Sequence, residues 1–290
     1  TTEVQQIPQF EHEELEMPRG VVTEAYSDSD NGLWIGGENG LWLAQPFQRN
    51  FQYKQLRNGA KTDNANCYTR FLELKDGRLL TINFYYHQLL VIQGSKTLHT
   101  FELPKRAALL YRDRAGQIWV GGGNQLFHFD ADKLELRPFP IEAKGWNPPE
   151  NGYFQEMAED SRGNFWFGHF NNGALVWQPK QNTWWVPDST QGFISKHVTS
   201  IAADSLRESV YLGTEDFGLF RFEWKSGQFE LYQHDPNRPR HSLGAYIVFD
   251  VCIDHEGVVW AATDPGGVSR FDPRATEGHQ FHNIQAMDGL

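Results

Sequence analysis

The chain has 290 residues, enough for one large domain or two ordinary ones, and 39% hydrophobic with 22% charged residues allows a sizeable core. The formal net charge of −11 disfavours contact with a phosphate backbone, so we expect no nucleic-acid partner. No apolar run approaches the roughly 20 residues of a membrane-spanning helix, so we expect no membrane contact within this segment.

From the N-terminus onward, the pattern predicts short strands and almost no helix. Only residues 11–17 approach helical spacing, and that segment is short and acidic. Elsewhere, runs of apolar residues rich in Val, Ile, Phe, Trp and Tyr are bounded by Gly, Asn, Asp and Pro. Such runs are typical of strands joined by tight turns.

One strand motif recurs about every 45 residues, a period typical of propeller blades. It runs apolar, aromatic, apolar, glycine. A polar turn precedes it, with the form Asp-x-x-Gly at 113–116, 160–163 and 254–257 and a looser form at 28–32 and 75–77. The copies are LWIGG at 33–37, IWVGG at 118–122, FWFGH at 165–169 and VYLGT at 210–214, with degenerate copies LLTIN at 79–83 and VWAAT at 259–263. A second short strand follows each copy, and an aromatic segment closes most units, so each unit contains about four strands.

We therefore predict an all-β fold, a β-propeller of four-stranded antiparallel blades. We interpret Trp34, Trp119, Trp166 and Trp260 as core side chains between blades rather than as ligand-stacking residues. The glycine after each aromatic residue lets a neighbouring backbone approach closely, and the Asp-x-x-Gly turn fits a hairpin.

Six repeat units are visible, which fits either a six-bladed propeller or an incomplete seven-bladed ring. We expect residues 1–290 to form a single propeller domain, with blade units over 20–285. Residues 1–19 are expected to contain an N-terminal strand, around residues 9–15, that latches the last blade.

The repeat unit resembles the two-component regulator propeller repeat. The resemblance is clearest over residues 232–273, where a His-Asp-Pro turn is followed by Ser-Leu and by an apolar strand that enters an Asp-x-x-Gly turn. Such repeats build the extracytoplasmic sensor regions of bacterial hybrid histidine kinases and diguanylate cyclases. The resemblance implies a periplasmic, ligand-sensing fragment of a larger receptor that self-associates through the full-length protein.

Cysteine usage leaves two alternatives. Cys67 and Cys252 are too few for a disulfide framework or a cysteine-rich zinc site. Either they form one disulfide, or they are two buried free thiols, which is the alternative we favour.

Polar residues of the predicted first strands are candidates for lining an axial funnel. Glu24, Arg70, Glu156 and Asp250 lie four or five residues before their turns, and Ser200 occupies the same place in its unit. Carboxylates beside an arginine suit a polar ligand. The alternative is a hydrated channel without a specific ligand.

Loops that follow the recurring strand, and one long linker, supply the other candidates. His87, Asn171, Glu215 and Asp216 lie in such loops. The linker at 146–153 carries Trp146 and Tyr153 beside asparagines, a combination that suits an oligosaccharide, although a packed surface loop fits equally.

Motifs of known enzyme classes are missing from the sequence. The histidines, His169 among them, are interpreted as surface or turn residues, so we expect no metal, no cofactor and no catalytic residue. A non-catalytic sensor of a small molecule or oligosaccharide is our first hypothesis. The alternatives are a propeller lyase or glycosidase, acting on a polysaccharide or a cyclic ester through Glu156, Glu215 or His87, and a protein-interaction scaffold.

Overall fold

The computed structural model describes residues 22–29, 32–37, 40–44, 51–54, 67–94, 96–238, 241–276 and 279–284. Their strands form six four-stranded antiparallel sheets, and within each sheet the strands lie in chain order. The described residues contain one short 3₁₀ helix, η1 (Ser189–Gln191), and no α-helix. The prediction of an all-β propeller with six four-stranded blades is therefore confirmed.

The chain divides into two compact units. The first contains blades 1 and 2, apart from residues 87–89 and 100–102, which belong to the second unit. Blade 1 consists of β1 (Val22–Ser27), β2 (Leu33–Gly37), β3 (Gly40–Ala44) and β4 (Phe51–Lys54). Blade 2 consists of β5 (Tyr68–Glu73), β6 (Leu79–Asn83), β7 (Gln88–Gln93) and β8 (Lys96–Glu102).

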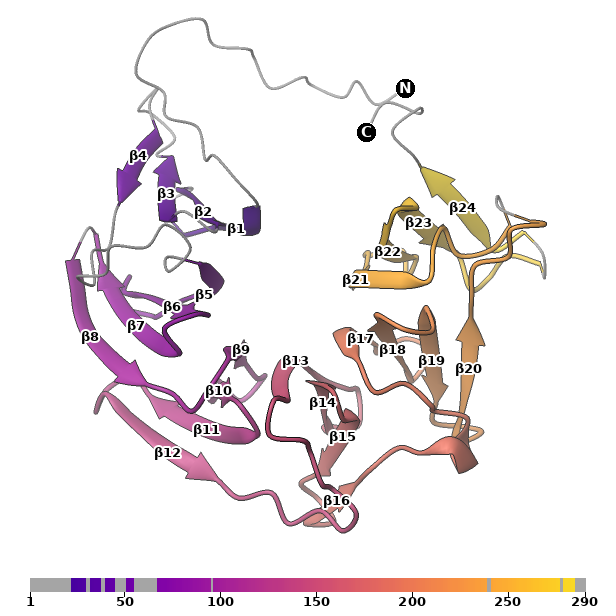
Figure 1. Cartoon of the computed structure of the whole chain (residues 1–290), viewed down its shortest axis with the longest axis horizontal. Helices are drawn as coiled ribbons and strands as arrows, with labels where there is room; N and C mark the ends of the chain where they lie inside the picture. The colour runs from indigo at the N-terminus through magenta and orange to yellow at the C-terminus, as the bar shows by residue number, and fades with distance from the viewer. Residues whose placement is uncertain are drawn as a thin grey trace, which may run out of the picture. The chain divides into compact units, whose positions relative to one another are not determined.

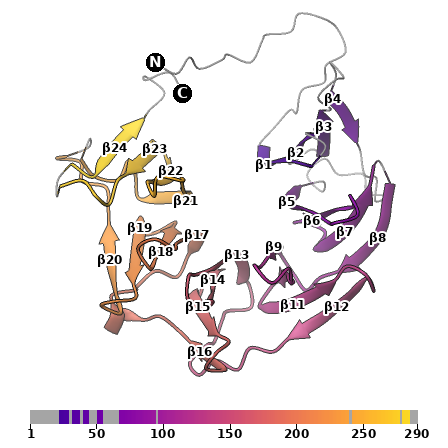
Figure 2. The same cartoon turned by 180° about the vertical axis from the view of Figure 1, so that it is seen from behind.

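Blades 3 to 6 make up the second unit. Their strands are β9 (Ala107–Arg112), β10 (Ile118–Gly122), β11 (Gln125–Asp130) and β12 (Glu135–Phe139); β13 (Tyr153–Glu159), β14 (Phe165–Phe170), β15 (Gly173–Gln178) and β16 (Thr183–Trp185); β17 (Val198–Asp204), β18 (Ser209–Thr214), β19 (Leu219–Glu223) and β20 (Gln228–Tyr232); β21 (Ile247–Ile253), β22 (Val259–Asp264), β23 (Gly267–Phe271) and β24 (Phe281–Ile284). Within this unit the first strands β9, β13, β17 and β21 are successive neighbours, and the fourth strands lie at the far edge of each blade (Figures 1 and 2).

A bond between the turn aspartate and the following tryptophan recurs in four blades. The indole nitrogen donates to one carboxylate oxygen, and the other oxygen accepts the backbone N–H that closes the hairpin. The pairs are Asp28–Trp34 at 2.7 Å, Asp113–Trp119 at 2.9 Å, Asp160–Trp166 at 2.9 Å and Asp254–Trp260 at 2.8 Å. One carboxylate therefore fixes both the turn and the orientation of the large side chain that packs between blades.

The glycine of the recurring strand motif allows the next blade to approach in blades 4 and 5. A Cβ added to Gly168 of blade 4 would lie 2.7 Å from Val198 Cγ1 of blade 5. A Cβ added to Gly213 of blade 5 would lie 2.8 Å from Val248 Cγ1 of blade 6. Both distances are shorter than carbon atoms tolerate, so glycine is required here, but the group that approaches is a valine side chain and not the predicted backbone.

Blade 2 replaces the whole motif by apolar residues. Leu74 stands at the turn position, Leu80 at the aromatic position and Ile82 at the glycine position, and all three are buried. Replacing both partners of a buried hydrogen bond by apolar groups leaves no polar atom without a partner. The degenerate sequence LLTIN is therefore a consistent alternative to the motif.

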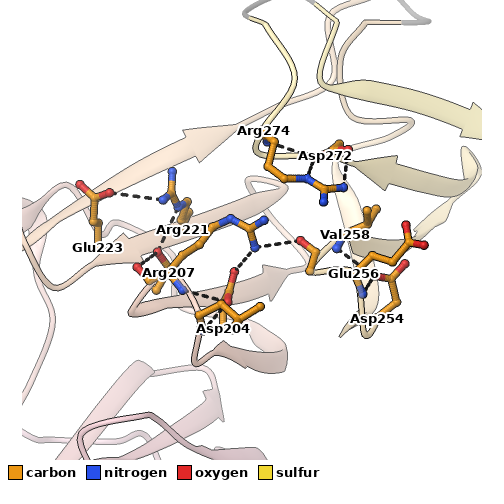
Figure 3. Close-up of polar contacts among 12 residues, drawn as sticks. Asp204, Arg207, Arg221, Glu223, Asp254, Glu256, Val258, Asp272 and Arg274 are labelled. Atoms are coloured by element: carbon orange, nitrogen blue, oxygen red, sulfur yellow. Dashed lines mark hydrogen bonds and ion pairs between the residues drawn. The ribbon is translucent and has the colours of Figure 1, made fainter.

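Arginines at the turns connect successive blades of the second unit. Arg114 donates to the carbonyl oxygen of Asp160, and Arg162 pairs with Glu208. Arg207 donates one guanidinium nitrogen both to Asp204 in its own blade and to the carbonyl oxygen of Gly257 in blade 6 (Figure 3). These bonds fix the inter-blade spacing at the turn ends of the blades.

The cysteine prediction is corrected in part. Cys67 is buried as expected, whereas Cys252 is a free thiol and is exposed. Successive side chains of a strand point to opposite faces, and Cys252 points away from the face that carries the buried Val251. The expectations for the N-terminal latch in residues 1–19 lie outside the described residues.

Replacing Asp160 by alanine tests the motif. Its carboxylate is buried and accepts the backbone N–H groups of Arg162 and Asn164 and the indoles of Trp166 and Trp224. Because the variant leaves several buried donors without a partner, we expect Asp160→Ala to lower the free energy of unfolding by about 2–4 kcal/mol. Urea denaturation followed by tryptophan fluorescence measures the change.

The matched control is Asp76→Ala, which alters the turn of blade 2, where the carboxylate is half exposed and bonds to Arg78. We expect the urea midpoint of this control to stay at the parent value. Equal midpoints for both variants would contradict the structural role of the aspartate.

Candidate functional site

Loops and linkers of the second unit form a cleft at the blade ends opposite the Asp-x-x-Gly turns. The cleft has a volume of about 380 Å³. It lies between the loop before β7, the linker from β8 to β9 and the linker from β12 to β13. Its lining consists of His87, Lys105, Arg106, Glu150, Asn151 and Gly152.

The backbone of the long linker is held in place by the loop between β10 and β11. The Asn124 amide donates to the carbonyl oxygen of Pro149 at 3.0 Å, and Phe154 N–H donates to the carbonyl oxygen of Gly123 at 3.1 Å. A turn inside the linker is closed by Gly152 N–H, which donates to the carbonyl oxygen of Pro149 at 2.9 Å. The cleft wall at 150–152 is therefore fixed by hydrogen bonds at both of its ends.

His169 packs against this wall at Gly152. It lies on β14, is fully buried, and its Nε2 contacts Asn124 Oδ1 at 2.9 Å. Burial lowers the pKa of His169 to about 3, so the ring is neutral at physiological pH. A Cβ at Gly152 would lie 2.3 Å from His169 Cε1, so only glycine fits above the ring.

The interpretation of His169 as a surface or turn residue was therefore wrong. The alternation of β14 puts this side chain on a buried face, and Asn124 provides the hydrogen bond that a buried imidazole requires. Its Nδ1 has no hydrogen-bond partner among the described residues.

The two aromatic candidates of the linker pack against the blade. Trp146 stacks on Phe154, with ring centroids 5.9 Å apart, and meets the edge of His169 at 5.2 Å. Tyr153 stacks on Phe170 at 5.3 Å. For Trp146 this is the packed loop that the sequence left open as an alternative to sugar stacking.

Charge in the cleft is predominantly positive. Lys105 Nζ lies 2.7 Å from Glu150 Oε1, so these two charges compensate each other in an exposed pair. Arg106 is exposed and forms no ion pair with a described residue; its guanidinium carbon lies 5.9 Å from the ring centroid of Tyr153. One cation is therefore left for a ligand, in a protein whose net charge is −11.

The remaining loop candidates lie elsewhere at the same blade ends. Asp216 accepts from Ser195 Oγ at 2.5 Å and from Lys196 N–H at 3.3 Å, so it holds the linker that precedes β17. Asn171 occupies the loop between β14 and β15 with a φ of 80°, which suits asparagine better than most residues. Glu215 is exposed, in the loop after β18.

The first-strand candidates occupy equivalent positions, four residues before the turn residue of their blades. In the first unit, Glu24 Oε2 lies 3.4 Å from Arg70 Nη1. In the second unit, Glu156 accepts the N–H of Met157 at 3.0 Å, and Asp250 accepts the N–H of Val251 at 2.8 Å. Each acidic side chain thus has a protein partner beside the bulge that interrupts its strand.

Lys105, Arg106 and Glu150 were missed as individual residues. The sequence indicated the loops and the long linker, but it gave no signal for the β8–β9 linker, which is short and has no repeat-specific feature. The cleft becomes visible only when three linkers from different repeats are brought together.

Comparisons with known proteins place the fold. No protein-family model matches the sequence, and no curated protein sequence matches it significantly. Among solved structures, the extracellular domain of a hybrid two-component system of B. thetaiotaomicron is similar with a TM-score of 0.66, at 17% identity over 90% of this chain. A second such domain, from a one-component system of the same organism, has a TM-score of 0.54, at 19% identity over 88% of this chain.

These matches differ in how much of the other protein they cover. The chain spans 35% and 39% of the lengths of the two extracellular domains. Virginiamycin B lyase from Staphylococcus aureus is also similar, with a TM-score of 0.61 at 13% identity, over 91% of this chain and 84% of the lyase. The resemblance to extracytoplasmic sensor propellers is confirmed at the level of the fold.

Two further features of the described residues bear on function. No group of three or more His, Cys, Asp or Glu among them could hold a metal ion. In the same part of the chain, no helix is long and apolar enough to cross a membrane.

The buried neutral state of His169 predicts a pH dependence of stability. Its folded pKa of about 3 lies below the unfolded value of about 6.5, so the unfolded chain binds the proton first as the pH falls. The free energy of unfolding should decrease by about 1.4 kcal/mol per pH unit below pH 6.5, and the loss ends near pH 3. Urea denaturation at pH 6.5 and pH 5 measures this slope.

The comparison that isolates His169 uses His169→Gln, with the exposed His255→Gln as control. We expect the first variant to lose most of the slope and the control to retain it. Burial also lowers the pKa of His128, so a smaller slope of the same sign should remain in His169→Gln. A parent slope that survives in His169→Gln contradicts a buried neutral His169.

Proposed function

We propose that this propeller is a ligand-sensing, extracytoplasmic module of a bacterial two-component or cyclic-di-GMP signalling receptor. In this proposal it is periplasmic and non-catalytic, and catalysis belongs to a signalling domain of the same receptor. The observation that carries the proposal is the cleft of about 380 Å³ at the linker ends of the blades. Its Arg106 forms no ion pair with a described residue.

Similarity of the fold to receptor domains supports this proposal. Two of the similar structures are extracellular domains of bacterial signalling proteins, and this chain spans little more than a third of each. A module of that kind acts inside a larger receptor, and self-association would then occur through the full-length protein. Protein binding by the propeller alone is the scaffold alternative.

The chemistry of the cleft supports one class of ligand. Arg106 offers an exposed guanidinium for bidentate contact with a carboxylate or sulfate, and the Lys105–Glu150 pair and Asn151 offer both donors and acceptors. A polar small molecule or an oligosaccharide that carries an anionic group matches this lining. We infer that an acidic sugar unit is the recognised element.

A propeller lyase is the second candidate, since this chain covers 84% of the similar lyase. Such an enzyme would act on a polysaccharide or cyclic ester through an acid–base pair in or near the cleft, where His87 lies. Formation of a product distinguishes the lyase from the sensor, because a sensor releases its ligand chemically unchanged.

Calorimetric titration with oligosaccharides that contain uronic acid tests the sensor proposal. We expect saturable 1:1 binding by the parent chain. Because a charge-assisted contact contributes about 1.5–3 kcal/mol, Arg106→Ala should weaken that binding at least about tenfold. The control is Lys144→Ala, which removes an exposed cation of the long linker that does not line the cleft.

Mass spectrometry of the same mixtures after overnight incubation detects turnover. Unchanged oligosaccharide together with an Arg106-dependent affinity supports the sensor. New products, with an unsaturated or hydrolysed end, would replace it by the lyase or glycosidase. Equal affinity of the parent and Arg106→Ala would remove the cleft as the ligand site.

A further inference from the structure

A second cleft, distinct from the one above, opens between blades 5 and 6. Its volume is about 580 Å³, within the roughly 300–1,000 Å³ typical of small-molecule sites. It is bounded by β20, by the linker that follows β20, and by residues at the start of β24. Figure 1 shows β20 and β24 at the far edges of these two blades.

The preceding blade junction shows what normally fills this space. Between blades 4 and 5, Trp166, Trp185 and Trp224 pack with Phe222 and Phe229 in one apolar cluster. The junction is closed by aromatic rings that contact each other edge to face.

Between blades 5 and 6 the aromatic filling is interrupted by charge. In register, Tyr211 on β18 faces Arg221 on β19, which faces Glu230 on β20. Arg221 lies 3.3 Å from Glu223 and 3.8 Å from Glu230, while Arg207 closes the turn end of the junction (Figure 3). Blade 3 also has polar residues at these register positions, where Trp119 faces His128 and His128 faces Arg137. The junction of blades 5 and 6 is therefore singled out by the cleft beside its charged residues, not by the charge alone.

The charges of this second cleft are balanced. Arg221 is compensated by Glu223 and Glu230, and Arg238 Nε lies 2.9 Å from Asp235 Oδ2. An ion of either sign would have to compete with these pairs for Arg221, Arg238, Glu230 or Asp235. A neutral ligand can accept from and donate to the pairs without separating them.

Hydroxyl groups and apolar ring faces complete the lining. Tyr232 OH donates to Glu230 at 2.5 Å, and the Tyr232 and Phe281 rings lie 5.7 Å apart. Tyr211 does not line the cleft but faces Arg221 across the sheet, and its buried hydroxyl has no hydrogen-bond partner among the described residues. Burial raises the pKa of Tyr211 to about 12, so this hydroxyl is a neutral donor.

From this lining we propose that the junction of blades 5 and 6 is a binding site for a neutral, hydroxyl-rich small molecule, such as a short uncharged oligosaccharide. The hydroxyls of such a ligand match the paired donors and acceptors, and its C–H faces match Tyr232 and Phe281. This site is separate from the Arg106 cleft and does not depend on the function proposed for it.

Titration calorimetry with uncharged trisaccharides tests the proposal. The probes are maltotriose, cellotriose, xylotriose and mannotriose, with trigalacturonate as the anionic counterpart. Two variants fill the cleft from opposite sides, Gln280→Trp on the β24 side and Gln233→Trp on the linker side. The matched control is Gln181→Trp, in the exposed turn between β15 and β16.

We expect at least one uncharged trisaccharide to bind the parent chain with 1:1 saturation. Its affinity should fall at least tenfold in both filling variants and stay within twofold in Gln181→Trp and Arg106→Ala. Thermal melts that match the parent establish that the filling variants are folded, and either variant alone suffices for the comparison. The proposal is overturned if no uncharged trisaccharide saturates, if a folded filling variant binds like the parent, or if the filling variants abolish trigalacturonate binding instead.

Discussion

The hydrogen bond between a turn aspartate and the indole of the following strand couples the hairpin turn of a blade to the packing between blades. The same carboxylate closes the first hairpin of a blade and orients the tryptophan that packs against the next blade. Asp160 extends this across a blade junction, because its second indole partner, Trp224, belongs to blade 5. A buried carboxylate with several donors is stable only when all of them are present, so local turn geometry and inter-blade packing depend on each other.

Where the motif changes, the junction changes with it. Blade 2 replaces the polar partners by leucines and an isoleucine and stays apolar. Blade 5 keeps the aspartate but substitutes Tyr211 for tryptophan, and Arg207 compensates Asp204 instead. That substitution leaves a buried hydroxyl at the junction with blade 6, where the larger of the two clefts lies. The Arg106 cleft lies at the linker ends of the blades and is formed by loops. The cleft at the junction of blades 5 and 6 is formed by altered packing between the blades.

Sequence patterns predicted the blades well because each unit has the same residue types at the same spacing. The spacing of Trp119 and Trp166 from their turns, and the glycines behind them, follow from strand alternation and close packing. The bond from aspartate to indole was not predicted, since a turn aspartate satisfies its local role without it. The cleft at Arg106 was predicted only in part: the sequence indicated His87 and the linker at 146–153, but it gave no signal for the β8–β9 linker that carries Lys105 and Arg106. His169 shows the same limit, since only Asn124 from another blade makes its burial tolerable.

Hydrogen exchange of the tryptophan indoles, measured by NMR on protein labelled with ¹⁵N-tryptophan, tests the central claim that this bond couples turn geometry to the packing between blades. Trp146 provides the internal comparison, because its indole nitrogen is buried but has no hydrogen-bond partner among the described residues. The structure predicts that the Trp119 and Trp166 indoles exchange with the slowest backbone amides, at the rate of global unfolding, and that Trp146 exchanges faster through local opening of its linker. Exchange of Trp119 and Trp166 as fast as that of Trp146 would contradict it.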